Sequence, residues 1–302
     1  MSQYINKIRT DQGDLQIDYN ALANLPTISN PNLLINGDFQ IWQRGESFSD
    51  IANKYTADRW MIKNAKSNTP LVEKSVATPT AEPVCQSMHI QDTADENTYL
   101  AYNFEHAIKG TYTLSFWYLS TTQISTYTHD NGSYVKLMDL AASSDWRRAH
   151  VSFHANAVDF INVIHAMKAG ECYITGIKLE VGTTATPFVP RVYAEELLLC
   201  LRYYQTVNCR LTMTVYSTDR ADGSYYFQVP MRGLPRTVTV NSMTYFDPTT
   251  EGFIESVDPV ANLGHINNKY VLIRMDRNAN DTFVIGQSRN ALIDMSIDAE
   301  IY

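Results

Sequence analysis

The sequence predicts an all-β protein: a jelly-roll β-sandwich, a short connecting helix and a second, smaller β-sandwich. The 302 residues include 19 Tyr in a background rich in Thr and Ser, and this composition favours strands over helices. Short runs of alternating polar and apolar residues recur along the chain, with Gly-containing turns between them. The length predicts two domains, since one domain usually takes roughly 100–200 residues.

Residues 1–29 differ in character from the rest of the chain. Leu15, Ile17 and Tyr19 alternate with polar residues and predict one small strand. The segment has too few apolar residues for a core of its own, so we interpret it as a docking peptide that orders on a partner. In the alternative interpretation, it is an N-terminal strand packed on its own body.

Residues 30–190 predict the first β-sandwich, and the number of short strands suits a jelly roll. Turn-forming pairs such as Lys109-Gly110 and Asn131-Gly132 separate the runs. The predicted strands are Asn32–Phe39, Arg59–Lys63, Leu71–Val76, Val84–Ile90, Thr111–Tyr118, Tyr134–Leu140, Arg148–Phe153, Phe160–His165 and Cys172–Val181.

Residues 191–207 interrupt this pattern and predict the connecting helix. The segment RVYAEELLLCLRYYQ (191–205) contains no Gly and no Pro, and its two Glu residues lie near the start, where the helix dipole favours them. A helix that is apolar on most sides should be buried on most sides, between domains or between subunits. The apolar residues concerned include Leu197, Leu198, Leu201 and Tyr204.

Residues 208–302 return to short alternating runs and predict the second, smaller β-sandwich. Turns are expected at 221–223 and 278–281. The predicted strands are Arg210–Tyr216, Tyr225–Val229, Thr237–Phe246, Gly252–Val257, Tyr270–Met275, Phe283–Gly286 and Met295–Ile301.

Charge and composition argue against several classes of protein. The net charge of −8 disfavours general binding to nucleic acid, whose phosphates repel an acidic surface. No apolar run approaches the roughly 20 residues of a membrane span, and the N-terminus lacks the apolar stretch of a signal peptide. We therefore expect no membrane insertion and assembly in a cytoplasm. Four cysteines without paired spacing should remain thiols there: Cys85, Cys172, Cys200 and Cys209.

Motifs for catalysis and metal binding are missing, so no catalytic residue, metal ligand or cofactor is predicted. His150 and His154 lie four residues apart, but on a strand this spacing is about 13 Å, too far for one metal ion. Asp92, Asp95 and Glu96 could approach calcium, yet they lack the pattern of a calcium loop, and we interpret them as a solvated loop.

Aromatic side chains in turn-rich stretches are the best candidates for ligand contact. STYTHDNGSY (125–134) combines Tyr faces, which stack on sugar rings, with groups that hydrogen-bond to hydroxyls. We expect it to be an exposed loop, and Tyr245-Phe246-Asp247 to lie in a similar setting. In the alternative, these residues make ordinary subunit contacts. The predicted carbohydrate-binding residues are Tyr127, His129, Asp130, Tyr134, Tyr245 and Asp247.

Several long motifs, taken in order, carry a resemblance to a known family. They are DLQIDYNALANLPTI (14–28), PNLLINGDFQIWQRGESF (31–48), YTADRW (55–60), GIKLEVGTTATPFVPRVYAEELLLCLRYYQ (176–205) and YYFQVPMRGLPRTVTV (225–240). Together they resemble tail-fibre and receptor-binding proteins of tailed bacteriophages. The first sandwich also resembles carbohydrate-binding jelly rolls that open with N-x-x-x-N-G-x-F, matched by Asn32, Asn36, Gly37 and Phe39. The Asp pair that helps many of those modules hold calcium has no counterpart at 173–176, where only Glu180 follows.

The resemblance implies a non-enzymatic, homotrimeric component of a phage tail, located in the virion and assembled in the bacterial host cytoplasm. Leu15, Ile17 and Tyr19 would attach it to other tail or baseplate proteins. Loops would bind host surface polysaccharide, with weak contacts strengthened by multivalency. The helix would lie at the trimer axis, with Leu197, Leu198, Leu201 and Tyr204 at the interface.

Two alternatives come from other functional classes. A surface-glycan hydrolase would need two carboxylates facing each other across a cleft. A purely architectural connector of the baseplate or fibre would bind virion proteins and no host sugar.

Overall fold

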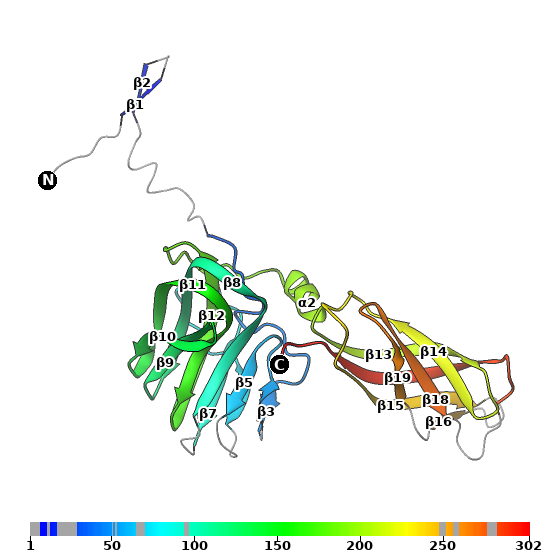
Figure 1. Ribbon diagram of the computed structural model, residues 1–302. Helices are drawn as coiled ribbons and strands as arrows, with labels where there is room; N and C mark the ends of the chain where they lie inside the picture. Colours follow the sequence, from blue (N-terminus) through cyan, green and yellow to red (C-terminus); the bar gives the residue numbers. More distant parts are fainter. Residues whose placement is uncertain are drawn as a thin grey trace.

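The computed structural model describes residues 7–10, 13–16, 29–49, 51, 53–64, 70–93, 97–247, 252–255, 260–276 and 283–302. Within these ranges almost all regular structure is β, with one helix, which confirms the predicted all-β class (Figure 1). The strands form two antiparallel sheets that build a first body (residues 29–190) and a second body (residues 204–302), with the helix α2 between them. No helix in the described ranges combines the length and the apolarity needed to cross a membrane.

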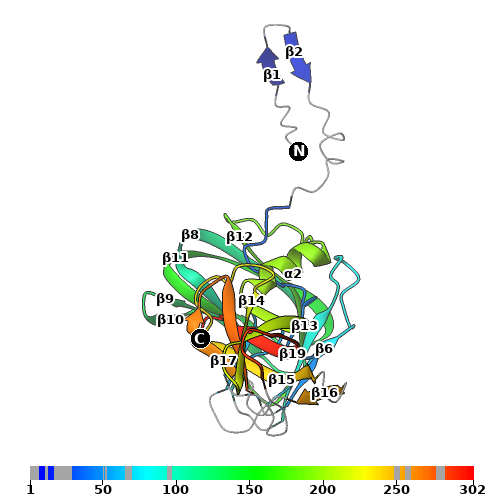
Figure 2. The same cartoon turned by 90° about the vertical axis from the view of Figure 1, so that its right-hand side faces the viewer.

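The described N-terminal residues form a separate two-stranded sheet (Figure 2). Its antiparallel strands are β1 (Lys7–Thr10) and β2 (Gly13–Gln16), with Leu15 opposite Ile8. Ile17 and Tyr19, which the sequence places in the same strand as Leu15, lie outside the described residues. Attachment of this segment to a partner stays a prediction.

Two long strands join the layers of the first body. β8 (Thr98–Ser120) and β11 (Ser143–Met167) pair along their length, and register shifts interrupt the ladder where they bend. One end of this pair continues into β5, β9 and β10, and the other end into β12, β7, β6 and β3. The remaining strands are β3 (Ser47–Phe48), β4 (Lys54–Tyr55), β5 (Met61–Asn64), β6 (Leu71–Ser75), β7 (Ser87–Asp92), β9 (Ile124–Asp130), β10 (Ser133–Leu140) and β12 (Gly170–Val181).

The core between these layers is aromatic. Trp60, Phe39 and Phe116 are fully buried, and the ring centroids of Phe39 and Trp60 are 5.4 Å apart. Trp42 is also buried in this core, whereas Trp117 is half-buried and donates its indole N–H to Glu82 at 3.0 Å. Such rings supply much of the buried area that stabilises a sandwich.

The N-x-x-x-N-G-x-F motif locks the start of the first body onto β12. The Asn32 amide donates to the carbonyl of Ile177 at 2.9 Å. Asn36 has a φ of 59°, and its side-chain amide binds the backbone of Ile41 in both directions. A Cβ on Gly37 would lie 2.1 Å from the Ile177 carbonyl oxygen, so only glycine fits. The motif is therefore structural in this chain.

Helix α2 (Tyr193–Leu201) is shorter than the sequence predicts, because Tyr204 already belongs to strand β13 (Tyr204–Val215). One face is buried within the chain: Cys200 of the helix packs with Ile35 and Ile41, and Tyr203, just after the helix, joins the same cluster. The other face is open, and the expectation that the helix is buried on most sides is wrong for the isolated chain. Tyr193 is 57% exposed there and Leu198 is 55% exposed.

The second body is one antiparallel sheet in the order β16-β15-β19-β13-β14-β18-β17. β15 also contacts β17, so the sheet curls around its own core. That core is rich in methionine: Met213, Met231, Met243, Met275 and Met295. The strands besides β13 are β14 (Arg220–Tyr226), β15 (Thr237–Asp247), β16 (Gly252–Glu255), β17 (Val260–Ile266), β18 (Tyr270–Asp276) and β19 (Ser288–Asp298).

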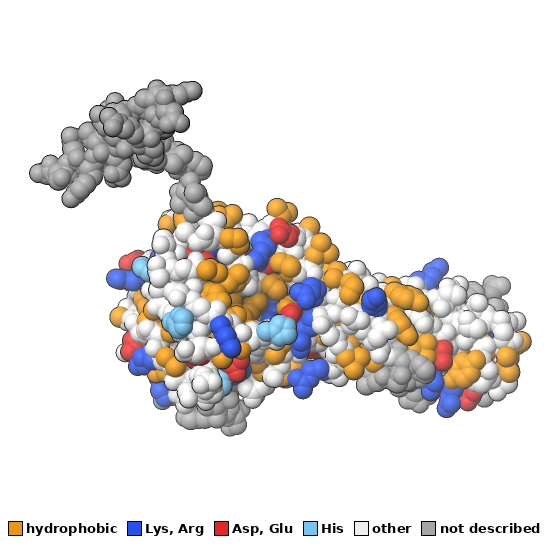
Figure 3. All heavy atoms as spheres, turned by 45° about the horizontal axis from the view of Figure 1, so that its top comes forward, with side chains coloured by type: hydrophobic (Ala, Val, Ile, Leu, Met, Phe, Trp, Pro, Cys, Tyr) orange, Lys and Arg blue, Asp and Glu red, His pale blue; other side chains and the backbone are white. Residues whose placement is uncertain are grey.

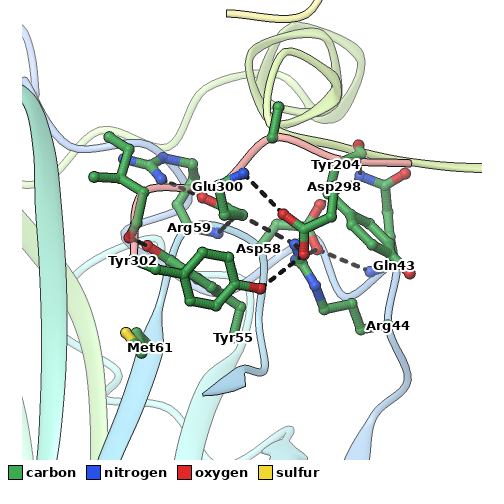
Figure 4. Close-up of polar contacts among 12 residues, drawn as sticks. Gln43, Arg44, Tyr55, Asp58, Arg59, Met61, Tyr204, Asp298, Glu300 and Tyr302 are labelled. Atoms are coloured by element: carbon green, nitrogen blue, oxygen red, sulfur yellow. Dashed lines mark hydrogen bonds and ion pairs between the residues drawn. The ribbon is translucent and has the colours of Figure 1, made fainter. Parts of the chain in front are cut away.

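Buried charges join the two bodies. Arg59 of the first body and Glu300, which follows β19, form a fully buried ion pair. Arg44 lies 3.5 Å from both Asp58 and Glu300, and its guanidinium stacks on the Tyr204 ring at 3.6 Å. Figure 4 shows these side chains pointing toward one another across the junction. Breaking such a pair leaves an uncompensated charge, so the pairing fixes how the bodies meet.

Candidate functional site

Aromatic side chains gather on the outer face of the layer formed by β5, β8, β11, β9 and β10. The reason is the period of two in a strand: on β9, Ile124, Thr126 and Thr128 point into the core, so Tyr127 and His129 point outward. Neighbouring strands bring further rings to the same face. This aromatic face consists of Tyr99, Tyr127, His129, Tyr134, Phe160 and His165.

The rings of the aromatic face form a continuous array across four strands. His129 is paired with Tyr134 on one side and with Phe160 on the other. His129 stacks on Phe160 with centroids 4.7 Å apart and an interplanar angle of 8°. Tyr127 stacks on His165 at 4.0 Å. Tyr99 meets His165 edge-on at 4.9 Å, so the array continues to β8.

Charged groups border the rings. The ammonium of Lys63 lies 4.1 Å from the centre of the Phe160 ring, and burial lowers its pKa while Asp159 opposes the shift. His129 Nδ1 lies 2.7 Å from a carboxylate oxygen of Asp159. Burial, together with the charge of Lys136, lowers the pKa of His165. A lowered pKa favours the neutral imidazole, which can both donate and accept a hydrogen bond.

This combination suits a polyhydroxylated ring. Aromatic faces pack against the C–H faces of a sugar, and the bordering Lys, His and Asp groups can exchange hydrogen bonds with its hydroxyls. The carboxylates on this face are engaged: Asp159 with His129, and Asp139 with Lys136 at 3.0 Å. The aromatic face therefore offers binding groups rather than the opposed acid and base of a glycosidase.

The structure brings together Tyr127, His129 and Tyr134 as the sequence predicts, but on strands. β9 and β10 form a hairpin, and the expected loop is reduced to a turn at Asn131-Gly132. These residues form a strand rather than a loop because every second residue of β9 is buried in the core.

Asp130 does not belong to the site. It is buried and accepts hydrogen bonds from the backbone amides of Asn156 at 3.1 Å and Ala157 at 2.7 Å. Although burial works in the opposite direction, these bonds lower its pKa. Its role is to hold the bend of β11, so the prediction of a sugar contact is wrong.

Tyr245 is also a wrong prediction. It is fully buried in the core of the second body, where its ring meets Phe283 edge-on at 5.6 Å. Its neighbour at the strand end, Asp247, pairs with Gly252 through the backbone, and its side chain lies outside the described residues. No receptor contact can involve Tyr245 while this core is intact.

Four members of the site were missed by reasoning from the sequence: Lys63, Tyr99, Phe160 and His165. Lys63, Phe160 and His165 lie in runs that predict strands, but alternation does not say which face of a strand is the core. Tyr99 lies in β8, before the strand that the sequence predicts at Thr111–Tyr118. An aromatic residue could be assigned to the outer face only if the register of its strand were known.

The residues predicted for a trimer interface have different environments. Leu201 is buried, Leu197 is half-buried against the core at the junction, and Tyr204 lies beneath Arg44. These contacts are made within one chain, which corrects the expectation that all four serve another subunit. Leu198 remains exposed.

The described residues contain no group of three or more His, Cys, Asp or Glu side chains that could hold a metal ion. Glu180 is engaged internally: Lys178 Nζ lies 3.4 Å from its carboxylate, and the amide of Thr186 donates to it at 2.8 Å. The four cysteines are free thiols, and burial raises the pKa of Cys172 to about 12.

No family model matches the chain, and no curated protein matches its sequence. Among solved structures, the chain is similar to the CBM22-1 xylan-binding domain from Paenibacillus barcinonensis Xyn10C, with 8% identity, 46% of this chain and 94% of that one covered, and a TM-score of 0.34. The chain is also similar to the CBM22-1-CBM22-2 tandem domain of the same protein. The identity is 8%, the match covers 90% of this chain and 98% of that one, and the TM-score is 0.35.

A third similar structure is the enzymatically active domain of tailspike protein 4 from bacteriophage CBA120. It shares 10% identity, and the match covers 44% of this chain and 21% of that one with a TM-score of 0.36. At such values no residue role passes from these proteins to this chain.

Proposed function

We propose that this protein binds carbohydrate without cleaving it. The observation that carries the proposal is the aromatic face, an array of six stacked or edge-on rings bordered by Lys63 and Asp159. Exposed apolar area of this kind is unfavourable in water, and a bound ligand would cover it.

We further propose that the chain works as an adhesion component of a phage tail, a tail fibre or receptor-binding protein. The order of its sequence motifs supports this role. In this proposal, residues 1–29 attach the chain to other tail or baseplate proteins, assembly takes place in the bacterial host cytoplasm, and the aromatic face meets host surface polysaccharide.

Homotrimer formation belongs to the same proposal. It is supported by exposed apolar side chains around α2, where Val192 is 73% exposed and Tyr193 and Leu198 are each more than half exposed. Figure 3 shows apolar side chains, in orange, spread over this face where the two bodies meet. Three copies would multiply weak glycan contacts into strong adhesion.

A binding experiment tests the carbohydrate proposal. The parent chain should be retained on an array of bacterial surface polysaccharides, and the double variant Tyr134→Ala, Phe160→Ala should bind at least tenfold more weakly, because it removes adjacent stacking rings. Tyr226→Ala is the matched control, since Tyr226 is 70% exposed on the second body. Equal binding by the double variant would reject the aromatic face. A parent chain that binds no polysaccharide would favour the architectural connector.

The oligomeric state is tested by light scattering. Three chains are expected for the parent, and Leu198→Glu should shift the equilibrium toward the monomer, because it places a charge on the exposed apolar face. Glu195, already exposed on the helix, gives the control Glu195→Gln. A parent that stays monomeric at every concentration contradicts the trimer.

A further inference from the structure

A cleft of about 660 Å³ lies where the two bodies meet, and it shares no residue with the aromatic face. Its size falls within the roughly 300–1,000 Å³ of ordinary ligand pockets. β4 of the first body lines one side, and β13, β15 and β19 of the second body line the other. A ligand held there would touch both bodies at once.

The floor of the cleft is fixed by ion pairs. Arg44 stacks on Tyr204 at 3.6 Å and lies 3.6 Å from Asp298. Asp298 also accepts a hydrogen bond from the Tyr302 hydroxyl at 2.8 Å. The Arg44 Nη1 group is buried and lies 3.5 Å from Asp58, without a hydrogen bond to any described residue. Figure 4 shows Tyr55 and Tyr302 beside this cluster; their rings meet edge-on at 5.3 Å.

The walls of the cleft carry polar groups that are free to bind. Thr239 on β15 pairs with Ser296 on β19, so their side chains lie on one sheet face, about 5 Å apart in the direction of pairing. Neither hydroxyl makes a hydrogen bond within the described residues, and the same holds for Thr237. On the opposite wall, the exposed Lys54 has no ion-pair partner in that part of the chain.

We propose that this cleft is a second carbohydrate subsite, which holds one or two sugar rings between the bodies. The Tyr302 ring, which is 57% exposed, offers a packing surface, a row of unengaged hydroxyls matches the hydroxyls of a sugar, and Lys54 adds a donor. The class of ligand rests on the proposed function, whereas the cleft itself does not. Occupation would add contacts across the junction and so would stabilise one arrangement of the two bodies.

Methyl NMR of the full chain separates the two sites. Ile51 lines the cleft, and Ile161 lies in the core beneath the aromatic face next to Phe160. The probes are glucose, galactose, N-acetylglucosamine and glucuronic acid, each titrated to about 0.1 M because a single sugar ring binds weakly. The Ile51 methyl signal should shift with at least one probe, and it should shift equally in Tyr134→Ala, Phe160→Ala.

The decisive variant is Thr239→Val, Ser296→Ala, which removes two hydroxyls with little change in shape. It should weaken the Ile51 response at least tenfold. Thr206→Val should not, because Thr206, which pairs with Ser296 from β13, is exposed and does not line the cleft. A larger loss in Lys54→Met for glucuronic acid than for glucose would show that the ammonium selects acidic sugars, and equal losses would show a neutral site.

Three outcomes overturn the subsite: an unshifted Ile51 signal with every probe, an Ile51 response that survives unchanged in Thr239→Val, Ser296→Ala, or one that disappears in Tyr134→Ala, Phe160→Ala. If Ile161 still responds in the first case, the proposed function stands and only the subsite fails. If the array experiment is negative while Ile51 shifts, the aromatic face fails and the subsite stands.

Discussion

The two bodies differ in how their cores and outer faces are made. The first body packs large rings such as Trp60 and Phe116 inside and presents a second set of rings outside. The second body packs five methionines inside and presents hydroxyls, among them Thr239 and Ser296, outside. Rings are rigid and fit in few ways, whereas methionine is flexible and adapts to its neighbours. The comparison teaches that the body with the more rigid core is also the one that presents an array of rings on its outer face.

The largest expected effect comes from cutting the junction that joins the two bodies. Glu300→Ala leaves Arg59 buried without its partner, and loss of one member of a buried pair costs about 3–5 kcal/mol. The free energy of unfolding, measured by urea denaturation, should fall by this amount, and the two bodies should then unfold in separate transitions. Lys74→Ala removes the exposed pair with Glu46 and should cost at most about 1 kcal/mol. A Glu300→Ala loss no larger than this control would mean that the bodies are coupled by other contacts.

The second expected effect is a change in pH dependence at the same junction. Burial raises the pKa of Asp58 to about 6, against the pull of Arg44. A carboxyl whose folded pKa lies above its unfolded value contributes stability below the unfolded pKa and loses it as the pH rises through the folded value. Over this window, from about pH 4 to 6, the stability of the parent should fall by an amount on the order of 3 kcal/mol that Asp58→Asn does not lose.

The measurement is the free energy of unfolding of parent and Asp58→Asn at a series of pH values. The slope is compared rather than the absolute value, since Asp58→Asn also weakens the contact with Arg44. Parallel curves for parent and Asp58→Asn would show that the Asp58 carboxyl titrates alike in the folded and unfolded chains.

A smaller effect is expected from the motif that closes the first body. Gly37→Ala brings a Cβ against the Ile177 carbonyl, and overpacking of this kind costs about 1–3 kcal/mol. In the Glu300→Ala background, where the two bodies unfold separately, thermal unfolding should show the loss in the first body and leave the transition of the second body in place. Gly233→Ala, where a Cβ meets open space, should change neither transition. An equal loss of stability in both bodies would mean that the contact of Gly37 with β12 does not stabilise the first body in particular.

The smallest effect is expected in the methionine core. Met243→Leu conserves volume, and its flexible neighbours can adjust, so the cost should stay below about 1.5 kcal/mol. In the first body, Phe116→Leu replaces a ring by a smaller group among rigid rings and should cost more. Urea denaturation of the two variants measures both values. Equal costs would remove the proposed contrast between the cores.

Much of the fold could be predicted from the sequence, because alternation and turn residues report local structure. The helix was found from the lack of Gly and Pro, but its end was placed too late, since Tyr204 is apolar in either a helix or a strand. Tyr245 and Tyr127 look alike in the sequence, yet one is fully buried and the other lies on the outer face. Only the register of neighbouring strands decides between them.

Long-range pairs explain the rest of what the sequence did not predict. Arg59 and Glu300 are separated by 241 positions, and nothing in either neighbourhood marks them as partners. Local sequence does not predict the cleft at the junction either, because its walls come from residues 44–55 of the first body and from residues 204–302 of the second body. Reasoning about local patterns therefore predicted the two bodies but not the contacts between them.

The place of β19 has a consequence for synthesis of the protein. β19 lies between β13 and β15, so the centre of the second sheet stays empty until Ser288–Asp298 has left the ribosome. Arg59 forms its ion pair later still, because its partner Glu300 follows that strand. A nascent or prematurely terminated chain would thus hold a finished first body beside an open sheet and an unpaired cation. Synthesis of residues 288–300 is then the step that closes the second sheet and pairs the buried cation of the first body.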